Sequence, residues 1–170
     1  MPLTKTLFSV AMRMLPAQTV HAHCDIPCGI YDPHTAQLAA LTTIRMNQLI
    51  NDLANQNIPA EQKQARLARY VATKEHHAEL CKQELRVLWG DYFRPEHLQQ
   101  YPNVHDLFFG AMKLASRVRQ EANLQAAQEL LARTQEIAEI FWKSKGAATR
   151  RQPSLQGAVG GELVYPVPQG

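Results

Sequence analysis

The clearest guide to the fold of this chain is the stretch AAQELLARTQEIAEIF, residues 126–141. Residues suited to a core return there at steps of mostly three and four, which is the spacing of one face of an α-helix. The positions on this face are Ala127, Leu130, Leu131, Thr134, Ile137, Ala138 and Phe141. The stretch therefore predicts an amphipathic helix that buries one face in a larger core.

Three earlier segments repeat this pattern, and the two connections between them contain prolines. The segments are residues 34–56, 60–89 and 104–118, with breaks at Asn57-Ile58-Pro59 and in the proline-bearing connection 90–103. Four amphipathic helices with short connections predict an all-α, up-down four-helix bundle over residues 34–145. Residues 146–170 are rich in Gly and Pro and show no period, so we expect a flexible tail there.

Composition limits the class of protein. The chain has 170 residues, of which 45% are hydrophobic and 19% charged, as expected for one globular domain. Its net charge of +3 comes from the two ends, because residues 23–145 carry equal numbers of basic and acidic side chains. A neutral body argues against nucleic-acid binding, which needs a basic face. No apolar run approaches the roughly 20 residues of a membrane-spanning helix.

Residues 1–22 contain no acidic side chain and end in Val20-His21-Ala22, a small-x-small pattern that would suit a cleavage site. A secretory signal is one interpretation of this leader. However, its apolar stretch Leu7–Met12 is short, and Arg13 interrupts it. We therefore predict a propeptide that is removed from a cytoplasmic protein.

The segment HAHCDIPCGIYDP, residues 21–33, follows this leader and is too rich in Pro and Gly for a helix. Its pair Cys24 and Cys28 suggests metal or redox chemistry, because three cysteines do not make a disulfide framework. Zinc usually takes four side-chain ligands from two separated pairs, and no second pair exists here. Two unrelated thiols in a loop are the alternative interpretation.

Cleavage after Ala22 would change the chemistry of this segment by freeing the α-amino group of His23. One short strand would then offer the His23 amine, the Cys24 amide nitrogen and the thiolates of Cys24 and Cys28. Such a planar set of nitrogen and sulfur donors suits Ni(II) or Cu(II). The His23 imidazole would add an axial ligand.

The string of residues 23–33, HCDIPCGIYDP, resembles the nickel hook of the nickel superoxide dismutase family at every fixed position of that motif. The resemblance continues in VLWGDYFRPEHLQQYP, residues 87–102, and in IFWKSK, residues 140–145. It implies disproportionation of superoxide to dioxygen and hydrogen peroxide by a redox-cycling nickel ion, one per subunit. It also implies a right-handed four-helix bundle, a homohexamer and a protease that removes the leader.

The resemblance assigns the metal ligands within residues 23–33. His23 would give its amine in the plane and its imidazole axially, Cys24 its amide nitrogen and thiolate, and Cys28 the second thiolate. Pro27 would be cis and would shape the hook. Anionic donors of this kind stabilise the oxidised metal. A nickel carrier without turnover and an inactive bundle that retains the hook are the alternatives.

The resemblance also assigns residues around the metal. Tyr31 and Tyr92 would order water or the incoming anion, and Asp25 would support the hook. The family orients its axial imidazole with a glutamate and an arginine, whereas this chain has Ala39 and His77 at those positions. We therefore expect an active enzyme with a differently tuned axial ligand.

Two expectations concern residues outside the hook. Arg94, Lys143 and Lys145 are candidates for attracting the superoxide anion, because basic residues at the mouth of a site raise encounter rates. Cys81 lies on an apolar helical seam and is expected to be a small core residue rather than a ligand.

Overall fold

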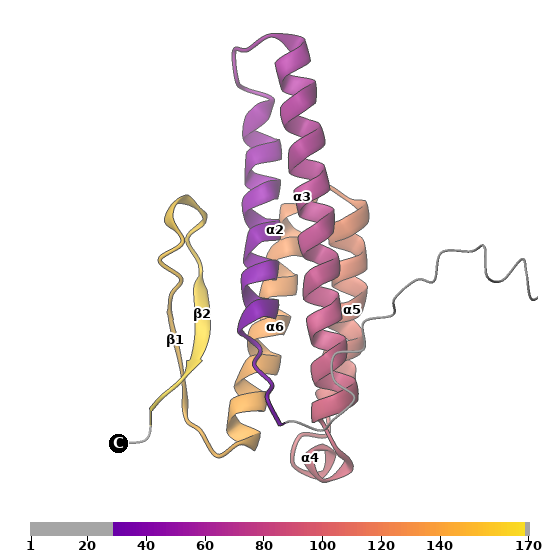
Figure 1. Cartoon of the computed structure of the whole chain (residues 1–170), viewed down its shortest axis with the longest axis vertical. Coiled ribbons are helices and arrows are strands. Elements are labelled where there is room, and N and C mark those ends of the chain that lie inside the picture. The colour runs from indigo at the N-terminus through magenta and orange to yellow at the C-terminus, as the bar shows by residue number, and fades with distance from the viewer. Residues whose placement is uncertain (1–28, 169–170) are drawn as a thin grey trace, which may run out of the picture.

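The structure, a computed structural model, describes residues 29–168 and has the predicted four-helix bundle (Figure 1). The bundle consists of α2 (His34–Leu53), α3 (Ala60–Val87), α5 (Val104–Gln120) and α6 (Leu124–Ser144). Each helix lies within about one turn of the range expected from its apolar period. Within the described part of the chain, no helix combines the length and the apolar character needed to cross a bilayer.

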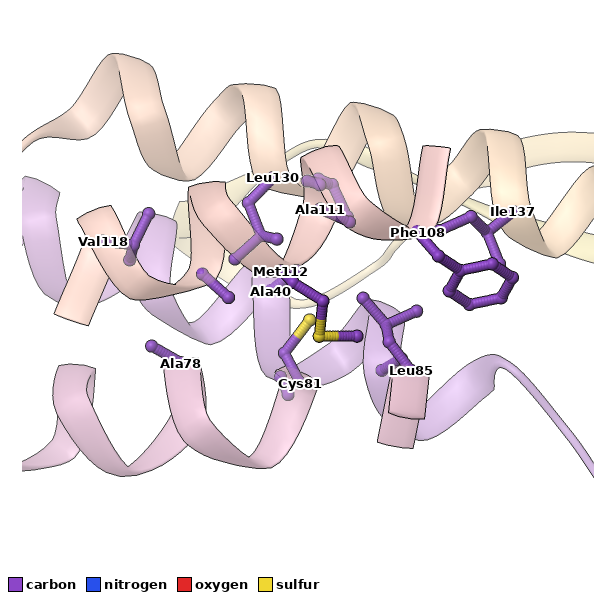
Figure 2. Close-up of a cluster of buried hydrophobic side chains, with 14 of the residues drawn as sticks. Ala40, Ala78, Cys81, Leu85, Phe108, Ala111, Met112, Val118, Leu130 and Ile137 are labelled. Carbon is purple, nitrogen blue, oxygen red and sulfur yellow. The ribbon is translucent and has the colours of Figure 1, made fainter. Parts of the chain in front are cut away.

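The four helices form a square in which each packs against two others. Helix α2 contacts α3 and α6, and α5 also contacts α3 and α6. Their shared core draws side chains from every helix, among them Ala40, Cys81, Phe108 and Ile137 (Figure 2). The upper ends of α2 and α3 project beyond α5 and α6 (Figure 1), since α3 has 28 residues and α5 only 17.

The connection between α3 and α5 is more ordered than the sequence suggested. Helix α3 continues into a π-helical turn, η1 (Leu88–Tyr92), which is followed by the short helix α4 (Pro95–Gln100). Pro95 opens α4, where the missing N–H of proline costs nothing. Single π-turns are often found at functional sites, and this one includes Tyr92. The short helix α4 that follows it lies at the lower end of the bundle (Figure 1).

The prediction of a flexible tail over residues 146–170 was wrong for most of that range. Strand β1 (Thr149–Pro153) pairs antiparallel with β2 (Glu162–Pro166), and the 3-10 turn η2 (Gly157–Val159) lies between them. The hairpin packs on the bundle beside α2 and α6 (Figure 1). Leu163 and Val164 are 0% and 2% exposed, so the hairpin adds to the core.

Specific contacts hold the hairpin on α2 and α6. The side-chain amide of Gln37, itself fully buried, donates to the Val164 carbonyl at 3.1 Å and accepts from the Val164 N–H at 2.7 Å. On α6, the Gln135 amide donates to the Glu162 carbonyl at 2.6 Å. Gly161 has a φ of +77°, a backbone conformation that strains other residues, and a Cβ there would lie 3.1 Å from the Leu41 side chain, which would have to shift.

Candidate active site

Most of the predicted metal hook lies outside the described residues. This applies to the expected ligands His23, Cys24 and Cys28, to Asp25, and to the expected cis bond at Pro27. The described chain begins at Gly29, whose φ of +74° is a left-handed conformation that glycine adopts readily. From there it runs past Tyr31 to the start of α2.

A cavity of about 250 Å³ opens where this segment meets the η1–α4 connection. It is lined by residues from both parts of the chain: Gly29, Tyr31, Asp91, Tyr92, Arg94, Glu96 and His97. The π-helical turn contributes Asp91 and Tyr92, and α4 contributes Glu96 and His97. The cavity is therefore next to the end of the hook.

The structure brings the two predicted tyrosines together in this cavity. The ring centroids of Tyr31 and Tyr92 are 5.6 Å apart, with the ring planes inclined at 58°. Sixty-one positions separate the two residues in the sequence, so only the fold can make them neighbours. Both tyrosines thus line the same small space.

Tyr92 is the more tightly held of the pair. Its ring stacks on His97 at 5.4 Å with an inclination of 11°, and lies 4.5 Å from the ring of Phe141. The Tyr92 hydroxyl is 2.7 Å from the Ser144 Oγ at the end of α6. Since aromatic neighbours and a hydrogen bond fix both ends of the side chain, Tyr92 forms a rigid wall of the cavity.

His97 is oriented by its own helix as well. Its Nδ1 accepts from the backbone N–H of Arg94 at 3.0 Å, at the start of α4. A ring nitrogen that accepts carries no proton, so the proton of the neutral imidazole is on Nε2. This bond and the Tyr92 ring together hold the His97 ring against the cavity.

Charges of both signs surround the cavity. Arg94 lines it together with two carboxylates, Asp91 and Glu96. The Lys145 ammonium lies 5.4 Å from the centroid of the Tyr92 ring and 5.0 Å from that of Phe141. Lys143 is exposed and is not among the lining residues. Of the three candidates for attracting an anion, Arg94 lines the cavity, and Lys145 lies over the ring of Tyr92, which lines it.

The two residues at the family's axial-partner positions are not among those that line this cavity. Ala39 is a core residue of α2, only 2% exposed, and carries no polar group toward a ligand. His77 lies on α3, where its Nδ1 is buried without a hydrogen-bond partner among the described residues. Burial lowers the pKa of His77, and the neighbouring His76 lowers it further. The imidazole of His77 is thus kept neutral with one nitrogen unused.

Cys81 has the core position that the sequence predicted. It is fully buried, and it belongs to the core cluster of the bundle together with Met112 (Figure 2). Burial raises the pKa of this thiol to about 12, although a contact with Thr134 at 3.8 Å works against the rise. A thiol that stays protonated is a poor metal ligand.

The sequence left four residues at this site without a role: Asp91, Glu96, His97 and Ser144. All four lie in the two later stretches that resemble the family, residues 87–102 and 140–145, so their location was visible before their function. The sequence spacing of these residues did not indicate that Ser144 contacts Tyr92, because the two are 52 positions apart and lie in different elements, η1 and α6.

The metal ligands must come from the hook if the site is a metal site. Within residues 29–168, no group of three or more His, Cys, Asp or Glu side chains could hold an ion. The donors offered by residues 23–28 are two thiolates, an amide nitrogen and, after cleavage, an amine. This donor set fits nickel in a planar nitrogen–sulfur site.

Comparisons with known proteins agree on one family. The model of the nickel-containing superoxide dismutase family matches residues 18–145. The superoxide dismutase [Ni] of Streptomyces coelicolor is 36% identical over 132 residues, which cover 78% of this chain and 95% of the relative. That of Streptomyces seoulensis is 37% identical over 134 residues, with the same coverage.

Solved structures give the same result. A native nickel superoxide dismutase structure superposes with a TM-score of 0.63 at 33% identity, covering 72% of this chain and 99% of that one. A structure with nickel ligation corresponding to the oxidised state gives 0.64 at 34% identity, with 74% and 100% covered. The family match ends at residue 145, so the C-terminal hairpin lies beyond it.

Proposed function

This chain belongs to the nickel-containing superoxide dismutase family and is a nickel-dependent oxidoreductase, and we propose that it disproportionates superoxide at a hook formed by residues 23–33. The observation that carries the proposal is the pairing of Tyr31 and Tyr92 in a cavity that Gly29 also lines. The two phenols and the end of the hook share one small space, as a site for a small anion requires.

The ligands that we propose are those of the hook. His23 gives its free amine and its imidazole, Cys24 its amide nitrogen and thiolate, and Cys28 its thiolate. Asp25 supports the hook and the nearby tyrosine through hydrogen bonds. When bound in this donor set, nickel supplies a one-electron couple between its divalent and trivalent states, because the anionic donors stabilise the higher state.

The described residues have three tasks in this proposal. Arg94 and Lys145 attract superoxide to the cavity, and the effect falls with salt because exposed charges are screened. Tyr31 and Tyr92 narrow the cavity and order its water, which protects the thiolates from peroxide. The aromatic stack of Tyr92 with His97 and Phe141 keeps this wall in place.

Maturation is part of the proposal. Residues 1–22 are a leader, and a protease cleaves between Ala22 and His23 to create the amine ligand. The mature chains assemble into a homohexamer in the cytoplasm, each with one nickel ion. The short, Arg-interrupted apolar stretch of the leader supports the cytoplasmic location over export.

The experiment that tests the proposal compares two forms of the same chain. The full chain and a chain beginning at His23 are loaded with nickel, and metal content, mass and superoxide consumption are measured for each. We expect stoichiometric nickel and rapid dismutation only in the form that begins at His23. Activity in the uncleaved form would refute the role of the amine, and nickel without turnover would identify a carrier.

A further inference from the structure

The contact between Tyr92 and Ser144 determines which way the Tyr92 hydroxyl points. The two oxygens are 2.7 Å apart, a normal distance for a hydrogen bond between hydroxyls. Taken alone, this distance does not say which hydroxyl donates. A second bond of Ser144 removes the ambiguity, since its Oγ also lies 2.7 Å from the carbonyl oxygen of Phe141.

Counting protons assigns the donor. A serine hydroxyl has one proton, and a carbonyl oxygen can only accept. The proton of Ser144 is therefore used in the bond to the Phe141 carbonyl. The remaining bond requires that the Tyr92 O–H donates to the Ser144 Oγ, so the Tyr92 proton is directed to the end of α6, and Ser144 is not among the residues that line the cavity.

We infer that Ser144 is a positioning residue that turns the Tyr92 hydroxyl into a hydrogen-bond acceptor toward the cavity. With its proton engaged, the Tyr92 oxygen offers only lone pairs to a ligand. Superoxide is an anion without a proton and finds no donor there. Water and hydrogen peroxide carry O–H groups and can donate to Tyr92.

The inference rests on the proposed function for its ligands, because it assumes that superoxide reacts at this cavity. It makes that function more specific: Tyr92 holds the water or the protonated product, and superoxide is attracted by other groups, such as Arg94. Reversing the arrangement would break the bond from Ser144 to the Phe141 carbonyl, so the fold favours the acceptor state.

The test measures the hydroxyl directly, in the metal-free full chain. The paired ring bands of tyrosine in Raman spectra change their intensity ratio according to whether the phenol donates or accepts. The chain has five tyrosines, so the Tyr92 signal is the difference between each protein and its Tyr92→Phe counterpart. We expect a donating phenol in the wild type, loss of that signature in Ser144→Ala, and its return in Ser144→Thr.

Ser116→Ala is the matched control. Ser116 likewise donates to a carbonyl of its own helix, that of Met112 at 3.1 Å, but on α5. We expect the Tyr92 signal to be the same as in the wild type. An accepting Tyr92 in the wild type, or an unchanged signal in Ser144→Ala, would overturn the inference whatever the nickel experiments show.

The nickel-loaded mature enzyme provides a second readout. Ser144→Ala frees the Tyr92 proton to enter the cavity, and we expect activity to fall about two- to tenfold, the value of one hydrogen bond. Ser144→Thr should recover most of it. A mature wild type without activity would instead count against the proposed function, leaving the spectroscopic result to decide the role of Ser144.

Discussion

Replacing Leu163 by Ala tests whether the C-terminal hairpin is part of the folded core. Leu163 is 0% exposed and belongs to the same cluster as the bundle side chains. Removing a fully buried leucine side chain costs about 2–5 kcal/mol in unfolding free energy. The loss reaches that range only if the hairpin stays docked until the bundle unfolds, because earlier undocking limits the loss to the free energy of docking.

Urea unfolding followed by circular dichroism provides the measurement, at a fixed protein concentration and under reducing conditions. Leu155→Ala is the matched control, since this leucine lies in the same hairpin but is 90% exposed. We expect a change within about 0.5 kcal/mol for the control. If both substitutions changed the unfolding free energy equally and by nearly zero, the reasoning would be refuted and the prediction of a flexible tail would stand.

Gln37→Ala examines the same docking from the side of the bundle. It removes both hydrogen bonds to Val164 and leaves a buried N–H and a buried carbonyl without partners, at a cost of about 1–3 kcal/mol. If the two substitutions report on one docking event, their effects should be non-additive by more than about 0.5 kcal/mol in the double variant. Additive effects would mean that Gln37 stabilises α2 independently of the hairpin.

Two further predictions concern charge. Cys81→Ala should reduce the loss of unfolding free energy at alkaline pH. The pKa of the folded thiol, about 12, lies above the ordinary 9.0, so the wild type loses about 1.4 kcal/mol of stability per pH unit between these values. If urea unfolding gave the same dependence of unfolding free energy on pH for both proteins, this reasoning would be refuted. Lys145→Gln should lower superoxide consumption at low salt, and its activity should approach that of the wild type at high salt. The control Lys113→Gln removes a cation over the exposed ring of Phe109 and should leave the activity unchanged. A loss in Lys145→Gln that does not depend on salt would contradict electrostatic attraction of superoxide by Lys145.

The bundle followed from the sequence because helix periodicity is a local signal. Each helix carries its own stripe of core residues, and a proline lies just before the start of α2, α3 and α5. The hairpin gave no such signal. Strand β1 is Thr-Arg-Arg-Gln-Pro, and β2 buries only two side chains. What holds it is the amide of Gln37, 127 positions away from Val164 in the sequence, and no local pattern contains that contact.

The candidate site likewise has a part that the local sequence indicated and a part that it did not. Chemistry alone indicated a metal-binding pair of thiols, but the two tyrosines were identified only by resemblance to the family. The structure then placed the ring centroids of those tyrosines 5.6 Å apart. The role of Ser144 follows from its hydrogen bonds to Tyr92 and to the Phe141 carbonyl. These bonds are known only from the structure, so the sequence could not indicate that role.

His77 is the described residue that tests how the axial imidazole is supported. Its Nδ1 is buried without a hydrogen-bond partner in the part of the chain that the structure describes, and burial lowers the pKa of the ring. His77 is eleven residues before Leu88, or about 16 Å up α3 from the turn that carries Tyr92. An extended chain spans roughly 3.5 Å per residue, so the six residues from Gly29 back to His23 are long enough to bridge that distance. A change in the electron paramagnetic resonance of the nickel on replacing His77 by Ala would mean that this histidine supports the axial ligand, whereas an unchanged spectrum would mean that its buried Nδ1 takes no part in the site.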